Sequence, residues 1–373
     1  MGSSERPPVW SYQPLKLLYQ LFYFITVLAR VPLWLTVSLV PALRPHPRWT
    51  IKQSFLTRLA YRVLESRSRI GVTEKLSLHP GKEGKRFEII PPLEAELYRG
   101  PLLSSQVEPE PVGGAWFPRA PGPDAASKTV ILLLHGGAFV QGTGREDYCG
   151  FAAKNMLEHD GADAVFCLSY RLSGYAGQNP FPAALQDTLA AYMHLLRKLK
   201  IPPSRLVIAG DSAGGNLVIA LMRYIYEFGK ELGIPPPRCG ALFSPLVAPF
   251  DFDFDTKPQR STDFLHRSFV VWGARTYAAG VEDAMSNPYM TPLGNPFPTP
   301  APIFVNVGTA EVFLDNCLRW VQQMRQTGGR EIELHLEEDA VHDTFLIGNQ
   351  IGFDESARKA TSAMMAFIQG QMI

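Results

Sequence analysis

The sequence has little cysteine and no excess of charge of either sign. Its 373 residues include four cysteines, none of which is part of a C-x-x-C pair. This scatter argues against a zinc site and a disulfide framework, and it predicts reduced thiols in an intracellular, reducing compartment. The 36 Lys and Arg residues and 35 Asp and Glu residues leave a net charge of +1. A balance this close to neutral excludes the basic footprint of a nucleic-acid-binding protein.

Two further absences narrow the class of protein. No predicted strand is followed by G-x-G-x-x-G, which argues against a dinucleotide-binding enzyme. The sequence also lacks internal repeats and low-complexity tracts. Its hydrophobic content of 46% and charged content of 19% are typical of a globular protein with a sizeable core.

One long apolar run lies near the N-terminus. In residues 17–43 the only charged residue is Arg30, and about 20 apolar residues suffice to span a bilayer. Arg30 and Pro32 lie mid-run, where a charge is costly and a proline kinks a helix, so two shorter helices are favoured over one span. Three interpretations stay open: a tilted or kinked span, a segment in the membrane interface, or a soluble helical pair covering a hydrophobic site.

From about residue 85 onward, short apolar runs alternate with helical patterns. This alternation predicts an α/β fold with a mostly parallel central sheet flanked by helices. The predicted strands are 129–137, 163–170, 205–210, 240–247, 302–308 and 331–338, with edge strands in 87–100 and 113–119. The predicted helices are 146–158, 182–199, 213–230, 311–326 and 353–370.

The pattern divides the chain into four segments. Residues 1–80 are expected to form an N-terminal helical cap or membrane-associated segment. Residues 81–247 and 291–373 form the two parts of the α/β core. Residues 248–290 are too long for an ordinary loop and are expected to insert a helical cap over the carboxyl ends of the strands, where open α/β sheets bind ligands.

A candidate nucleophile follows the third strong strand. Residues 210–214 fit G-x-S-x-G, the strand-to-helix turn that exposes a serine, here Ser212. Serine is a weak nucleophile at neutral pH. It therefore needs a base, an acid that orients the base, and donors for the developing oxyanion.

Candidate oxyanion donors follow the first strong strand. His135, Gly136 and Gly137 come directly after it, and consecutive glycines let backbone N–H groups approach a substrate carbonyl. Ala213 offers a further N–H at the start of a helix. The alternative is a tight glycine turn without catalytic meaning. His135 is expected to shape this loop and not to move protons.

The base and the acid are sought after the serine, because the chain order in this fold class is Ser, Asp or Glu, then His. Of the three later histidines, His342 follows the last predicted strand at the carboxyl edge of the sheet, whereas the others lie in the cap and inside a strand. Glu311 follows the preceding strand directly and is the favoured acid. Asp315, one helical turn later, is the fallback.

Together these motifs resemble the hormone-sensitive-lipase-like carboxylesterases of the α/β-hydrolase superfamily over residues 128–348. The matching segments are HGG at 135–137, YRL at 170–172, PFPAALQD at 180–187, GDSAGG at 210–215, NPYMTPL at 287–293 and VHDTF at 341–345. The chain departs from the family at Ala138, at Glu311 in place of the usual Asp, and in the longer loop 173–179. The aromatic N-terminus resembles fungal members.

The resemblance implies an α/β-hydrolase fold, no cofactor, and ester hydrolysis under a helical cap. It also assigns roles. The implied nucleophile, base and acid are Ser212, His342 and Glu311, and the implied oxyanion donors are Gly136, Gly137 and Ala213. A structural ion pair between Arg171 and Asp187 is implied as well.

The sequence therefore predicts a serine carboxylesterase acting on a small-molecule ester, such as an acetylated or short-acyl apolar natural product. One alternative is a non-hydrolytic enzyme of the same fold that forms C–C bonds in a fungal biosynthetic pathway. A second is a receptor-like binding protein. The only further partner expected is a membrane surface contacted by residues 17–43.

Overall fold

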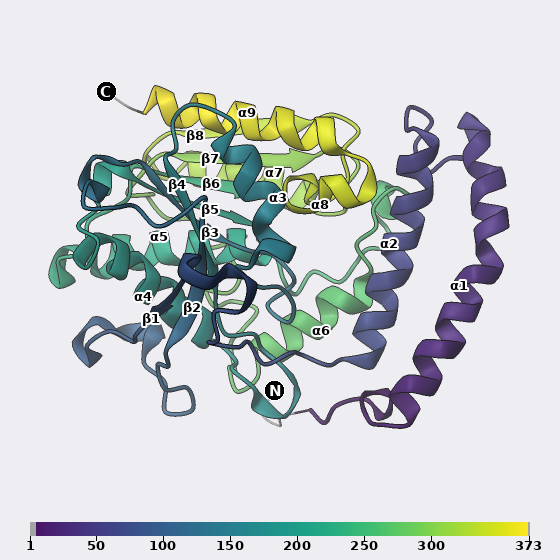
Figure 1. Cartoon of the computed structure of the whole chain (residues 1–373), viewed down its shortest axis with the longest axis horizontal. Coiled ribbons are helices and arrows are strands. Elements are labelled where there is room, and N and C mark those ends of the chain that lie inside the picture. The colour runs from purple at the N-terminus through teal and green to yellow at the C-terminus, as the bar shows by residue number, and fades with distance from the viewer. Residues whose placement is uncertain (1–4, 372–373) are drawn as a thin grey trace.

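The computed structural model describes residues 5–371, within which eight strands form one sheet (Figure 1). The strands are β1 (Phe87–Ile90), β2 (Val112–Phe117), β3 (Val130–Leu134), β4 (Ala164–Ser169), β5 (Leu206–Asp211), β6 (Cys239–Phe243), β7 (Ile303–Gly308) and β8 (Ile332–Glu337). Their order is β1-β2-β4-β3-β5-β6-β7-β8. β2 runs antiparallel to both of its neighbours, and the strands from β4 to β8 are mutually parallel. The mostly parallel sheet predicted from the sequence is confirmed.

Helices cover both faces of this sheet. The α-helices of residues 5–371 are α1 (Leu15–Leu39), α2 (Ile51–Ile70), α3 (Glu146–Leu157), α4 (Ala183–Arg197), α5 (Ala213–Leu232), α6 (Arg267–Tyr277), α7 (Leu314–Arg325), α8 (Thr344–Ile351) and α9 (Asp354–Gly370). α3, α8 and α9 pack together against one face, whereas α4, α5 and α7 cover the other. The short helix α8 is absent from the sequence prediction.

The core is split by the alternation of side chains along the strands. In β3, Ile131 and Leu133 belong to the cluster under α3 and α9, whereas Leu132 and Leu134 belong to the larger cluster under α4 and α5. All four are fully buried, as expected for a parallel strand covered on both faces.

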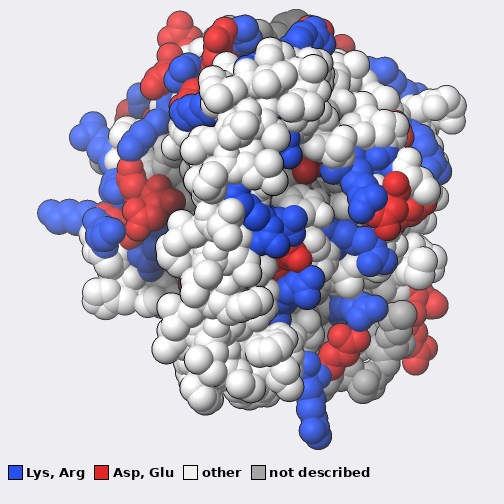
Figure 2. Space-filling model, turned by 90° about the vertical axis from the view of Figure 1, so that its right-hand side faces the viewer, with Lys and Arg blue, Asp and Glu red and all other residues white. Residues whose placement is uncertain are grey.

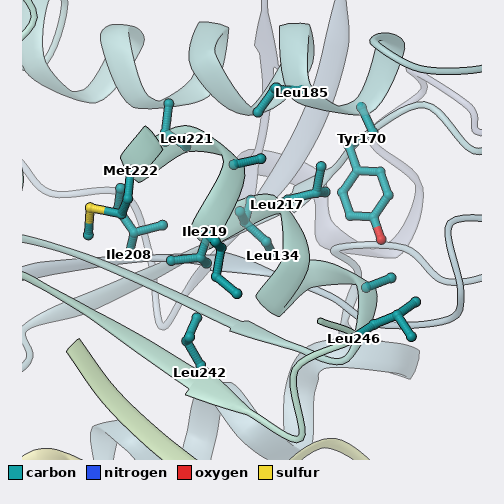
Figure 3. Packing of buried hydrophobic residues seen from close by; sticks show 14 of the residues in the cluster. Leu134, Tyr170, Leu185, Ile208, Leu217, Ile219, Leu221, Met222, Leu242 and Leu246 are labelled. Carbon is teal, nitrogen blue, oxygen red and sulfur yellow. The ribbon is translucent and has the colours of Figure 1, made fainter. Parts of the chain in front are cut away.

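Helix α5 runs through the larger cluster. Figure 3 shows Leu217 and Leu221 of this helix among Leu134 and Ile208 from the sheet and Leu185 from α4. Because α5 is buried along most of its length, it holds the residue at its N-terminus in a fixed position relative to the sheet.

The N-terminal apolar run forms one helix, so the predicted break into two shorter helices is wrong. α1 continues through Pro32. A proline removes only one backbone hydrogen bond, and packing against α2 compensates. Tyr23 donates a 2.8 Å hydrogen bond to Glu65, and the hydroxyls of Ser38 and Ser54 lie 2.8 Å apart. We call residues 15–70, which contain α1 and α2, the N-terminal hairpin.

The hairpin is joined to the rest of the chain through α2. This helix begins with a capping box at Thr50 and ends at Gly71, whose left-handed conformation suits glycine. α2 contacts both α6 and α8, whereas α1 lies outside it (Figure 1). α6 lies within residues 248–290, the segment expected to form a cap; the division into four segments itself stays a prediction.

Candidate active site

Ser212 occupies the sharp turn between β5 and α5. Its backbone angles are φ 49° and ψ −113°, a region that residues with a side chain rarely adopt. The turn is tight because α5 packs closely on the sheet: a Cβ at Gly214 would overlap the carbonyl oxygen of Leu134. Glycine is therefore required at this position, and the turn projects the serine hydroxyl beyond the end of β5.

The His342 ring lies next to this hydroxyl. Its Nε2 is 3.0 Å from Ser212 Oγ, and the side chain is almost completely buried in the loop between β8 and α8. The other two histidines after the serine lie elsewhere. His266 caps the start of α6, and His335 is a half-buried residue of β8.

Glu311 stands behind the imidazole. Its Oε1 lies 3.8 Å from His342 Nδ1, which is an ion-pair distance longer than a hydrogen bond. The carboxylate is fully buried and accepts hydrogen bonds from the Ser244 hydroxyl (2.5 Å) and the Gly308 N–H (3.1 Å). Asp315, the fallback acid, is exposed in the first turn of α7. The structure therefore brings Glu311, and not Asp315, to the histidine.

The charges around His342 favour its protonated form. Burial is the largest single influence and lowers the pKa of the imidazole, but the carboxylates of Glu311, Asp263 and Asp211 together raise it by more. The net pKa lies above the ordinary value of 6.5. A ring with this balance accepts a proton readily, as a general base must.

Asp263 and Ser244 belong to this site and were missed from the sequence. Asp263, in the expected cap segment, accepts hydrogen bonds from the backbone N–H of His342 (3.3 Å) and of Val312 (2.9 Å). Ser244 follows β6 and accepts a 3.0 Å bond from the Asp343 N–H while it donates to Glu311. No motif marks Asp263. Ser244 follows the strand next to β5, a placement that could have revealed it.

The candidate oxyanion donors lie around Ser212. A Cβ at Gly136 would lie 3.1 Å from the Cβ of Ser212, so this glycine packs directly against the turn. Gly137, with φ 105°, and Ala138 form part of the pocket wall together with Ser212. Ala213 is the first residue of α5.

His135 supports this loop from behind. It is fully buried and stacks on Tyr170 with ring centroids 4.3 Å apart. Burial lowers its pKa to about 4, so the ring is neutral near pH 7. The expected pair is also present: Arg171 lies 2.8 Å from Asp187, and both are buried.

A pocket of about 670 Å³ opens above Ser212 and His342. One wall is apolar and comes from the segment 248–290 and the start of α7; it contains Phe264, Leu265, Phe269, Val270, Trp272 and Phe313. The other wall comes from α2. The longer loop 173–179 contacts the apolar wall from outside, where Tyr175 stacks on Trp272 with ring centroids 6.5 Å apart. Among residues 5–371, no group of three or more His, Cys, Asp or Glu side chains is placed to hold a metal ion.

The sequence model of a protein family described as the alpha/beta hydrolase fold matches residues 131–346. This range covers more than half of the chain and includes Ser212, Glu311 and His342. The chain belongs to this family. The α/β-hydrolase fold predicted from the sequence is confirmed.

Individual relatives agree with this assignment. The chain is 28% identical to an acetyl-hydrolase of Streptomyces hygroscopicus over 53% of this chain and 62% of the relative. It is also 28% identical to esterase LipU of Mycobacterium tuberculosis, over 62% and 76% of the two chains. The chain thus spans less than two thirds of the acetyl-hydrolase. A hormone-sensitive lipase from a metagenome library shares the fold, with a TM-score of 0.58, 24% identity, and coverage of 84% and 98%.

Proposed function

We propose that this α/β-hydrolase is a serine carboxylesterase. The observation that carries the proposal is the 3.0 Å contact between Ser212 Oγ and His342 Nε2. The buried carboxylate of Glu311 lies on the opposite side of the same ring. A hydroxyl, a base and an orienting acid in this arrangement suit nucleophilic attack on an acyl group.

The proposed reaction has two halves. Ser212 Oγ attacks the ester carbonyl carbon while His342 Nε2 takes the hydroxyl proton. The intermediate then collapses, and His342 returns the proton to the leaving alcohol oxygen. Water attacks the acyl-enzyme in the same way and releases the carboxylic acid. The developing oxyanion is assigned to the N–H groups of Gly136, Gly137 and Ala213.

The proposed substrate is an apolar ester with a short acyl group, such as acetyl. The pocket wall formed by Phe264, Phe269 and Trp272 favours an apolar alcohol part. The short acyl group is supported by the names of the relatives, one of which is an acetyl-hydrolase. The resemblance of the N-terminus to fungal members stays a prediction, because the relatives above are bacterial.

The Ser212→Ala variant tests the proposal. We expect it to fold normally and to lose about 10⁴-fold or more in kcat on p-nitrophenyl acetate, because the nucleophile is gone. A fluorophosphonate should label the wild-type protein at Ser212. Ser204→Ala, which changes an exposed serine near the start of β5, should match the wild type in both measurements.

Three outcomes would contradict the proposal. Hydrolysis by Ser212→Ala at the wild-type rate would remove Ser212 from the reaction. Labelling of Ser212 without turnover of any short-acyl aryl ester would favour the non-hydrolytic alternative, and failure to label would favour a binding protein.

A further inference from the structure

The outer face of α1 is apolar and uncovered. Eleven of its 25 residues are exposed Leu, Ile or Phe side chains, and Phe22 and Ile25 are 65% and 64% exposed. Figure 2 shows this face of the molecule as a long column without charged side chains, with basic side chains and some acidic ones along its edges. Soluble monomers rarely expose so large a continuous apolar patch, so a partner is expected to cover it.

The charge of the hairpin indicates which partner. Residues 15–70 contain nine Lys and Arg residues and one acidic residue, Glu65, which gives a net charge of +8 in a chain of net charge +1. Five of these cations have no carboxylate within ion-pair distance in the described part of the chain: Lys16, Arg30, Arg44, Arg58 and Arg67. In a dimer formed through this face, a hairpin of net charge +8 would lie against a second hairpin of net charge +8, and the two would repel each other. An anionic lipid surface complements both the charge and the apolar column.

The orientation of α1 follows from how its two ends are held. Before the helix, the carbonyl oxygen of Glu5 accepts a 3.1 Å bond from the Ala176 N–H. After it, Trp49 donates a 2.7 Å bond to the carbonyl oxygen of Asp339. Both ends are therefore tied to the same globular body. In addition, α2 lies alongside α1 and contacts it extensively (Figure 1). A helix held in this way cannot cross a bilayer, but it can lie in the plane of one surface.

The pocket above Ser212 reaches this same hairpin. Its wall includes Lys16 and Gln20 of α1 together with Leu59 and Val63 of α2. A molecule dissolved in the lipid beside the hairpin would thus lie next to residues that line the pocket.

We propose that α1 lies in the plane of an anionic membrane surface, with its outer face among the lipid headgroups and acyl chains, and that the pocket draws its substrate from that membrane. The substrate class is then an apolar ester dissolved in lipid. This second part rests on the proposed esterase function, whereas the membrane contact does not.

The contact is tested by flotation of the full chain with phosphatidylcholine vesicles that contain or lack phosphatidylserine. The test variant is L18Q/F22Q/I25Q, which removes three neighbouring exposed side chains that do not line the pocket. The control is L103Q/M285Q/L336Q, which changes equally exposed apolar residues outside the hairpin. We expect wild type and control to bind vesicles that contain phosphatidylserine. We expect the test variant to bind the same vesicles at least about tenfold more weakly. High salt should weaken binding.

Several results would overturn the membrane contact. One is flotation of L18Q/F22Q/I25Q equal to that of the wild type, and another is equal wild-type binding to vesicles without phosphatidylserine. A third is a wild-type dimer in solution that L18Q/F22Q/I25Q converts to a monomer, because the occupant of the face would then be a second copy.

Activity separates this inference from the proposed function. L18Q/F22Q/I25Q should hydrolyse dissolved p-nitrophenyl acetate like the wild type and should lose rate only on a long-chain p-nitrophenyl ester held in vesicles. Equal rates on the vesicle-held ester would overturn the proposed route from the membrane. If the wild type hydrolysed neither ester, the esterase proposal would fail while the flotation result would stand.

Discussion

Ser212 holds a backbone conformation that is costly for a residue with a side chain. Positive φ at such a residue costs of the order of 1 to 3 kcal/mol, and the surrounding packing must enforce it. Here the packing comes from α5, whose buried side chains fix the start of the helix against β3 and β5. This conformation directs the Ser212 hydroxyl away from the sheet and toward His342. The backbone strain is thus confined to Ser212, and the packing of α5 in the core maintains it.

The acid limb of the pH–rate profile is predicted from the same site. Only the neutral imidazole of His342 can accept the serine proton, so kcat/KM should fall as pH drops through the pKa of His342, which lies above 6.5. Glu311→Gln removes the negative charge that raises this pKa, so the limb should move to lower pH while kcat falls by about 10²-fold or more. Asp315→Asn, which changes the exposed neighbouring carboxylate, should leave the profile unchanged. A limb that stayed in place in Glu311→Gln would show that Glu311 does not act on His342.

At the scale of single residues, the sequence predicted the candidate site wherever a motif constrains the backbone. The order Ser212, Glu311, His342 came from the expected ends of strands, and the structure does bring these side chains together. Asp263 could not be found in this way. It lies in a segment without periodicity, about 80 residues before the histidine whose N–H it binds, and only the folded path of that segment brings the two together.

At the scale of elements, periodicity predicted the strands of the parallel sheet and most of the helices. It failed for α8, which has eight residues and follows the candidate base directly, so its pattern is too short to read. It also failed for α1, where Arg30 and Pro32 suggested a break. Arg30 stays exposed and bonds back to the Thr26 carbonyl oxygen, and contacts with α2 outweigh the hydrogen bond lost at the proline.

The close approach of α5 to β3 gives an element-scale prediction. In Gly214→Ala the new methyl group would overlap the Leu134 carbonyl oxygen, which is backbone and cannot move aside without shifting the strand. We expect a loss of about 1 to 3 kcal/mol in the free energy of unfolding, measured with urea, and a loss of activity because Ser212 moves with the helix. Gly370→Ala, near the end of α9 where the added methyl meets nothing, is the control and should be neutral. Unchanged stability and activity in Gly214→Ala would show that the turn tolerates a wider spacing.

At the scale of the whole molecule, the net charge near zero results from two parts of the chain with opposite net charges. The hairpin carries +8, so the other residues, with 27 Lys and Arg against 34 Asp and Glu, carry −7. The sequence prediction used the total of +1 to exclude a nucleic-acid-binding protein, and that total says nothing about one segment. The two parts also attract each other: Arg48 of the hairpin pairs with Glu338 and Asp339 at 2.9 and 2.5 Å. These exposed pairs contribute little stability, so the hairpin must be held mainly by packing.

Trp49, at the turn between α1 and α2, is part of that packing. It is 2% exposed, donates to the Asp339 carbonyl oxygen, and meets Phe353 edge-on with ring centroids 5.4 Å apart. Trp49→Ala should therefore lower the free energy of unfolding by about 3 to 5 kcal/mol in urea. Because α2 forms one wall of the pocket, KM for the ester should also rise in protein that remains folded.

Trp10→Ala is the matched control, since Trp10 is 41% exposed and far less of its ring is buried. It should cost less than about 1 kcal/mol and leave KM unchanged. If Trp49→Ala lowered stability without changing KM, the hairpin would be a separate attachment and α2 would not shape the pocket. If both quantities changed, the hairpin and the hydrolase core would be one folding unit, in which the surface proposed to contact the membrane and the wall of the substrate pocket are held by the same side chain.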